Sequence, residues 1–374
     1  MSLDTERIEN ELVVTLQNDI NSYLYYALPL CVILSDNKFQ SWFFEHYIQI
    51  ASIIYANGNM GCQYVDGVTY DFRRFYDDVI ELNSVGSIII KYNLDIIEYI
   101  RDCIDAGYYL VIFADEYYLP QKLSFNKKHF VHDSLIYGYD NEKQQIKAIA
   151  FDIKHKFNKI LYNYEQYKKA FRSGCQYYKE SGIHWMEGRL VNTIKQNKFI
   201  EDYPFSIGRF LKQLRNYLDS VIDNKSEYFL RLIETGNEQV KYGIDVYDMF
   251  TCRLEELLRE NKISGLGYPT VHFLYEHKQG IFKRLKYITS IYKIDNNLAE
   301  LIGEYQKIVD KINMMRNIFL KCMYVNREDE STFSSYKFQD NIRKIIDILN
   351  SVKEEESIIL AAIYKKLVIN KLWR

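Results

Sequence analysis

The chain has 374 residues, a hydrophobic fraction of 48% and a net charge of −2. This length favours two domains with separate cores, and the near-neutral charge gives no general attraction to nucleic acid or to an anionic membrane. Six cysteines occur without a CxxC pair, so we expect reduced thiols in the cytoplasm. No leader is visible and no apolar run approaches the roughly 20 residues that span a bilayer. We therefore expect neither export nor membrane insertion.

The first part of the chain, to about residue 165, is expected to mix helix and strand. A polar run before Leu24 suits a helix N-terminus and predicts a helix over Ser22–Leu34, with Pro29 as a kink or an early end. An amphipathic pattern predicts a second helix over Asp95–Ala106. Strands are expected at residues 52–56, 67–72, 87–90, 109–114, 131–138 and 146–152, the last two as an antiparallel pair.

Beyond residue 165 the pattern is helical. Apolar residues recur three and four positions apart from Leu298 to Phe319, and the same period returns at 342–349 and 354–371. The sequence thus predicts an α+β protein. We expect residues 1–165 to form a first domain with an antiparallel sheet, and residues 166–374 to form an α-helical domain.

The pair of strands at 131–138 and 146–152 carries the main chemical signal. His132 lies on the first strand, and Asp152 ends the second. In a papain-like site an imidazole takes a proton from a nucleophile, and a carboxylate fixes the tautomer of that imidazole. We therefore expect His132 as the base and Asp152 as its orienting carboxylate. Asp140 follows Gly138 in a turn-forming sequence and is expected at the hairpin tip.

Such a site also needs a nucleophile at a helix N-terminus and an oxyanion donor. Cys31 falls inside the first predicted helix, where an inert buried thiol is expected, and no helix start follows Cys62. Ser22 lies at the helix start, and Gln17, five residues earlier, could donate from its side-chain amide. Position favours Ser22 and reactivity favours a cysteine. A serine at a helix start is also an ordinary cap.

Further motifs accompany His132 and extend over most of the chain. They are Asp105–Pro120, Gly138–Asp140, Tyr242–Tyr247, Glu276–Lys278 and Arg284–Tyr287. Together these segments resemble the butirosin biosynthesis protein H family, whose N-terminal domain is related to the bacteriocin-processing, papain-like cysteine peptidases. The resemblance implies a papain-like fold for the first domain.

In that family a cysteine opens the first helix, often as Asn-Cys-Tyr, and the matching segment here is Asn21–Tyr23. The resemblance implies that Ser22 holds the nucleophile position, with His132 as base, Asp152 as orienter and Gln17 as oxyanion donor. A serine where the family has a cysteine leaves three interpretations open. The chain is a Cys-to-Ser variant of an active enzyme, it uses serine natively, or the position is inactive.

The activity implied by the resemblance is acyl transfer in antibiotic assembly. An acyltransferase or amide synthase would move an acyl group from a carrier-protein thioester to an amine through an acyl-enzyme on residue 22. The family also resembles the amide-forming enzyme of polythioamide antibiotic assembly, which is a related possibility for this chain. No resident cofactor is expected, since the substrate would arrive on the phosphopantetheine arm of an acyl or peptidyl carrier protein. A papain-like hydrolase (peptidase or thioesterase) and a catalytically inactive binding protein are the alternatives.

The second half offers two weaker signals. A basic cluster at residues 277–286 on a predicted helix could contact an acidic carrier protein or form a solvated helix face. His277 has no second histidine at a helical spacing, so we expect no metal site. The helical domain is a candidate lid or acceptor-binding surface. The oligomeric state stays open, with a homodimer as one expectation.

Overall fold

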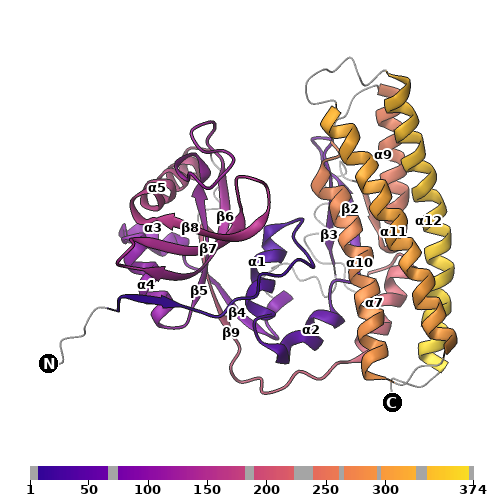
Figure 1. The fold of residues 1–374 in the computed structure, drawn as a ribbon, viewed down its shortest axis with the longest axis horizontal. Coiled ribbons are helices and arrows are strands. Elements are labelled where there is room, and N and C mark those ends of the chain that lie inside the picture. The colour runs from indigo at the N-terminus through magenta and orange to yellow at the C-terminus, as the bar shows by residue number, and fades with distance from the viewer. Residues whose placement is uncertain are drawn as a thin grey trace. The chain divides into compact units, whose positions relative to one another are not determined.

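The computed structural model describes residues 7–65, 75–181, 189–222, 239–260, 265–292, 296–325 and 335–369. The predicted α+β class is confirmed, with antiparallel sheets mainly in the N-terminal half and helices in the C-terminal region (Figure 1). The chain forms two compact units, each made of two segments. The sheet unit comprises residues 1–40 and 73–202, and the helical unit comprises residues 41–72 and 203–374.

The sheet unit is built, in its described residues, on a seven-stranded antiparallel sheet. The strand order is β4-β9-β5-β6-β7-β8, and β1 pairs with β6. Its elements are β1 (Glu9–Glu11), α1 (Leu24–Ile33), β4 (Ile80–Ser84), α3 (Gly86–Tyr92), α4 (Ile96–Asp105), β5 (Tyr109–Asp115), β6 (Val131–Asp140), β7 (Gln145–Phe151), β8 (Phe157–Asn163), α5 (Tyr164–Ser181) and β9 (Val191–Gln196).

Helices α4 and α5 cover one face of this sheet. Ile100 of α4 and Phe171 of α5 share a buried core with Ile112 of β5 and Ile136 of β6. Directly paired residues of antiparallel strands lie on the same face, so the residues of β5 and β6 that pair with members of this core face α4 and α5 as well.

Helix α1 packs on the opposite face. Tyr109, which alternates with the core-facing residues of β5, donates its hydroxyl to the carbonyl of Val13 at 2.6 Å. Two residues further on, the N–H of Thr15 donates to the carbonyl of Cys31 in α1. The segment before α1 thus ties this helix to the Tyr109 side of the sheet.

Most predicted elements of this unit are confirmed: α1, α4, β5 and the β6–β7 pair lie where the sequence places them. Helix α1 continues through Pro29 to Ile33. The strand predicted at 87–90 is wrong, because α3 occupies this segment and buries Gly86 and Ile89, three positions apart. Asn93, in the left-handed conformation with φ 48°, ends that helix. The strand predicted at 67–72 lies outside the described residues.

Gly138 lies in β6 at the point where β1 pairs with this strand. It pairs with Glu11, and a Cβ atom at Gly138 would lie 2.7 Å from the carbonyl oxygen of Asn10. The strand also shifts register between Ile136 and Gly138. This glycine within β6 therefore permits the close approach of two backbones.

We expect Gly138→Ala to destabilise the sheet unit by about 1–3 kcal/mol, the usual cost of forcing a side chain into a filled space. Thermal unfolding followed by circular dichroism measures this loss. Gly303→Ala is the control, because a Cβ atom at Gly303 meets no heavy atom within 4 Å. Alanine within a helix should be neutral or stabilise slightly. Equal melting temperatures for Gly138→Ala and the unchanged protein would contradict the steric argument.

The helical unit combines a small sheet with long helices. Its strands pair antiparallel in the order β10-β2-β3, and α10, α11 and α12 run side by side (Figure 1). The elements are α2 (Gln40–Glu45), β2 (Ile50–Ile54), β3 (Met60–Tyr64), α7 (Ile207–Leu218), β10 (Gln239–Tyr242), α9 (Val246–Glu260), α10 (Tyr268–Ile291), α11 (Asn296–Val325) and α12 (Tyr336–Ile369).

The single boundary expected near residue 165 is corrected by this division. Helix α5 continues the sheet unit beyond that point because its Phe171 enters the core of the sheet. Residues 41–65 join the helical unit because α10 binds this segment. Arg284 donates to the carbonyls of His46 at 2.8 Å and Phe43 at 3.1 Å, and Nε2 of His277 donates to the carbonyl of Ile48 at 2.8 Å.

The basic cluster at 277–286 is therefore largely internal. His277, Lys278 and Arg284 are at most 1% exposed, whereas Lys286 is exposed. Burial, with the nearby charge of Lys278, lowers the pKa of His277 well below its usual value. These three residues organise the core of the helical unit, so the expectation of a solvated or carrier-binding helix face is wrong for them.

One buried polar cluster, here called the Glu356 cluster, joins five helices. Its members are Tyr217 of α7, Tyr247 of α9, Lys278 of α10, Tyr305 of α11 and Glu356 of α12. The Glu356 carboxylate lies 3.0 Å from Nζ of Lys278 and accepts hydrogen bonds from the three tyrosine hydroxyls at 2.6–3.1 Å. Because both charges are 0% exposed, these contacts must replace water completely.

Candidate active site

His132 lies near the start of β6, on the face that α4 and α5 cover, because it pairs with Ala114 of the core on that face. Its Nδ1 is 3.3 Å from Oε1 of Glu116. Its Nε2 is 3.7 Å from Oδ1 of Asp133, which is too long for a hydrogen bond. The side chain is 31% exposed. The structure thus presents a partly exposed imidazole with Nδ1 held by the Glu116 carboxylate and with no hydrogen bond at Nε2 in the described residues.

A second histidine–carboxylate pair adjoins the first in sequence. Nδ1 of His129 is 2.6 Å from Oδ2 of Asp115, and the same carboxylate accepts from Oγ of Ser173 on α5 at 2.7 Å and from the N–H of Phe130 at 3.0 Å. Burial alone would raise the pKa of Asp115, but these hydrogen bonds hold it below its usual value. Tyr117 stacks on the His129 ring.

Lys122 supplies the positive charge beside Glu116. Its Nζ lies 3.0 Å from Oε1 of Glu116 and donates to the carbonyl of Phe151 at 2.9 Å. Burial would raise the pKa of Glu116, but the hydrogen bond with His132 and the charge of Lys122 hold it below its usual value. We call Asp115, Glu116, Lys122, His129, His132 and Asp133 the imidazole–carboxylate cluster.

Asp152 occupies the position that the sequence predicts but makes different contacts. Counting on from the pair Leu135–Ile149 places Asp152 opposite His132. Its carboxylate instead accepts hydrogen bonds from the N–H groups of Lys154 at 2.8 Å and Lys156 at 2.9 Å. These bonds close the turn between β7 and β8 and, although burial acts in the opposite direction, lower the pKa of Asp152.

Ser22 and Gln17 lie at the start of α1, as predicted. Ser22 is two residues before Leu24, the first residue of the helix. The Gln17 amide is turned into its own loop, where it donates to the carbonyls of Ile20 at 2.8 Å and Ala27 at 3.2 Å. Because α1 packs on the Tyr109 face, the structure does not bring these two side chains to His132.

The two cysteines considered as nucleophiles are buried. Burial raises the pKa of Cys31 to about 12, against a smaller opposing effect of a hydrogen bond with Gln17. Burial likewise raises the pKa of Cys62. At neutral pH both remain thiols, and a thiol is a poor nucleophile.

Glu116 is the site residue that sequence reasoning missed. A signal for it lies in the motif Asp115–Pro120, where Asp115 ends a buried strand and Glu116 directly follows it. A loop separates Glu116 from His132 in the chain. The sequence alone does not define the path of this loop, so it does not predict that the two side chains meet.

Asp133 supplies a pH-dependent test of the cluster. Burial raises its pKa despite the nearby His132 and Lys122. Its charged form is therefore disfavoured in the folded protein, and the cost appears as pH rises from the usual range of aspartate to the raised pKa. We expect Asp133→Asn to unfold at a higher temperature than the unchanged protein at pH 7. The difference should shrink as pH falls toward about 4.

Thermal unfolding at several pH values measures this difference, with Asp140→Asn as control. The Asp140 pKa is lowered by its bonds with Lys143, so loss of its charge should not stabilise the protein at pH 7. A stabilisation by Asp133→Asn that is the same at pH 4 and pH 7 would contradict the role assigned to its charge.

No protein-family model matches this sequence, and comparison with curated proteins gives no match. Across the described residues, no group of three or more histidine, cysteine, aspartate or glutamate side chains is arranged to hold a metal ion. In the same residues, no helix is both long and apolar enough to cross a membrane.

Proposed function

We propose that the sheet unit catalyses acyl transfer from a thioester to an amine, with His132 as general base and Glu116 as the carboxylate that holds it. The observation that supports this role is the partly exposed imidazole, which has a buried carboxylate at Nδ1 and no hydrogen bond at Nε2 within the described residues. A histidine held in this way can accept a proton from a nucleophile.

The geometry favours direct attack over an acyl-enzyme. Nε2 of His132 takes a proton from the acceptor amine as its nitrogen attacks the thioester carbonyl. The tetrahedral intermediate then collapses, the carbon–sulfur bond breaks, and the leaving thiolate takes the proton from the imidazolium. This sequence conserves protons and needs no protein nucleophile. The acyl-enzyme on residue 22 implied by the resemblance remains the competing route, because a helix N-terminus favours an anionic nucleophile.

Acyl-pantetheine thioesters with a panel of small amines test the proposal, with product masses measured with and without amine. We expect amide and free pantetheine from the unchanged protein, and little free acid in the presence of amine. Hydrolysis at the same rate with and without amine would favour the hydrolase alternative. Tight binding of the thioester without any turnover would favour the binding-protein alternative and overturn the proposal.

Two variants of residue 22 distinguish the routes. Direct transfer predicts that Ser22→Ala forms amide at a rate within about tenfold of that of the unchanged protein. A loss of this size is smaller than the loss expected when a general base is removed. Ser22→Cys should acquire no acyl adduct that depends on His132, as read by intact mass and peptide mapping. A His132-dependent adduct on residue 22 would establish the covalent route in place of the direct one.

A further inference from the structure

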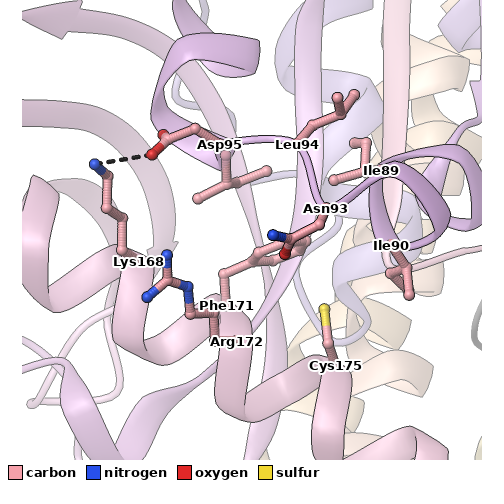
Figure 2. A pocket seen from close by; sticks show the side chains of 10 residues that line it. Ile89, Ile90, Asn93, Leu94, Asp95, Lys168, Phe171, Arg172 and Cys175 are labelled. Carbon is pink, nitrogen blue, oxygen red and sulfur yellow. Dashed lines mark ion pairs between the residues drawn. The ribbon is translucent and has the colours of Figure 1, made fainter.

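A cavity lies in the sheet unit, between α3, the start of α4 and α5 (Figure 2). Its volume is about 450 Å³, within the range of small-molecule sites. The apolar lining consists of Ile89, Ile90, Leu94, Ile96 and Phe171. Ile90 is 39% exposed and Leu94 is 42% exposed, so the apolar wall continues to the protein surface.

The polar side of this cavity carries an excess of positive charge. Lys168 forms an ion pair with Asp95 at 3.0 Å, drawn as the dashed line in Figure 2. The Asp95 carboxylate also accepts from the N–H of Ile97 at the start of α4, so this acid is already engaged. Arg172, one turn after Lys168 on α5, forms no ion pair within the described residues. An unpaired guanidinium therefore adjoins an apolar cavity.

We propose that this cavity binds a small amphipathic carboxylic acid. The apolar tail would lie against Phe171 and Ile89, and the carboxylate would meet Arg172. Planar guanidinium groups bind carboxylates through paired hydrogen bonds, and burial of the tail supplies the remaining affinity. The site is separate from His132 and does not depend on the proposed acyl transfer. It shares only helix α5, whose Ser173 binds Asp115.

Cys175 provides a direct measurement, because its thiol lines the cavity (Figure 2). The full-length protein is labelled with N-ethylmaleimide at increasing octanoate concentrations, and the rate at each cysteine is read by peptide mapping. Burial raises the pKa of Cys175 to about 11, so labelling is slow and a bound ligand should slow it further. Cys252, which is exposed on the helical unit, is an internal control whose rate should not change.

Variants and a neutral probe test the charge recognition. Arg172→Gln should weaken octanoate protection about tenfold, equivalent to ~1.4 kcal/mol of binding free energy. Lys169→Gln, an exposed change on the same helix outside the cavity lining, should leave the protection unchanged. 1-Octanol should protect much less than octanoate. Absence of protection by millimolar octanoate, equal protection by 1-octanol, or an Arg172→Gln variant with unchanged affinity would overturn the proposal.

Discussion

His132→Ala is expected to form amide from thioester and amine about 10²- to 10⁴-fold more slowly than the unchanged protein, the usual contribution of a positioned general base. The alanine cannot take the amine proton, whereas Nε2 of His132 makes no hydrogen bond in the described residues and can accept it. Initial rates of amide formation by mass spectrometry measure the loss. His129→Ala is the matched control, because that residue is bound to Asp115 and not to Glu116. A slower His129→Ala than His132→Ala would show that the catalytic imidazole is His129.

The same assay separates the two carboxylates proposed for His132. Glu116→Gln should slow amide formation and alter the pH–rate profile, because the amide does not stabilise an imidazolium as a carboxylate does. Asp152→Asn should retain most of the rate, because its carboxylate binds the turn that follows β7. Circular dichroism of both variants excludes unfolding as the cause. The opposite ranking would restore Asp152 as the orienting acid.

The Glu356→Gln variant is expected to lose about 3–5 kcal/mol of unfolding free energy, the usual cost of leaving one member of a buried ion pair uncompensated. Lys278, which is 0% exposed, would keep its surroundings and lose its countercharge. Burial already lowers the pKa of Lys278, and Glu356 opposes that effect. Urea unfolding followed at the helical circular-dichroism signal measures the change.

Two further variants establish that charge causes this loss. The double variant Lys278→Met/Glu356→Gln should be more stable than Glu356→Gln alone, because it contains no isolated buried charge while the amide oxygen still accepts from tyrosine hydroxyls. Glu355→Gln is the surface control. Its partner Lys311 and its own side chain are 37% and 39% exposed, so a loss of at most ~1 kcal/mol is expected. A double variant less stable than Glu356→Gln would contradict the argument.

The candidate site could be predicted from sequence only where strand register determines it. The alternation of β6 and β7 places Asp152 opposite His132, and the structure agrees with that position. The direction in which the Asp152 carboxylate points depends on whether it binds the imidazole or the nearby N–H groups of Lys154 and Lys156. Such local capture by a turn is common for aspartate. Glu116 reaches His132 through a loop, for which no periodic pattern exists.

In the fold, too, the features that depend on neighbouring residues could be predicted, and those that depend on residues far apart in the chain could not. The amphipathic periods of α4 and α11 predict these helices because one turn already determines the buried face. The apolar run at 87–90 is compatible with both structures, since a short series of isoleucines suits a strand as well as a helix. Lys278 could not be recognised as a core residue because its countercharge, Glu356, lies on a helix 78 positions later.

We expect the Glu356 cluster to delay the closure of this core during synthesis. Four of its five helices, α7 to α11, leave the ribosome before the segment that carries Glu356. Until that segment emerges, the ammonium of Lys278 and three tyrosine hydroxyls lack the acceptor that satisfies them. Packing of the nascent helices against one another therefore stabilises them little at that stage. The core should become stable only when α12 has been synthesised and packs against them. A chain arrested before Glu356 is accordingly the form that chaperones and proteases should engage.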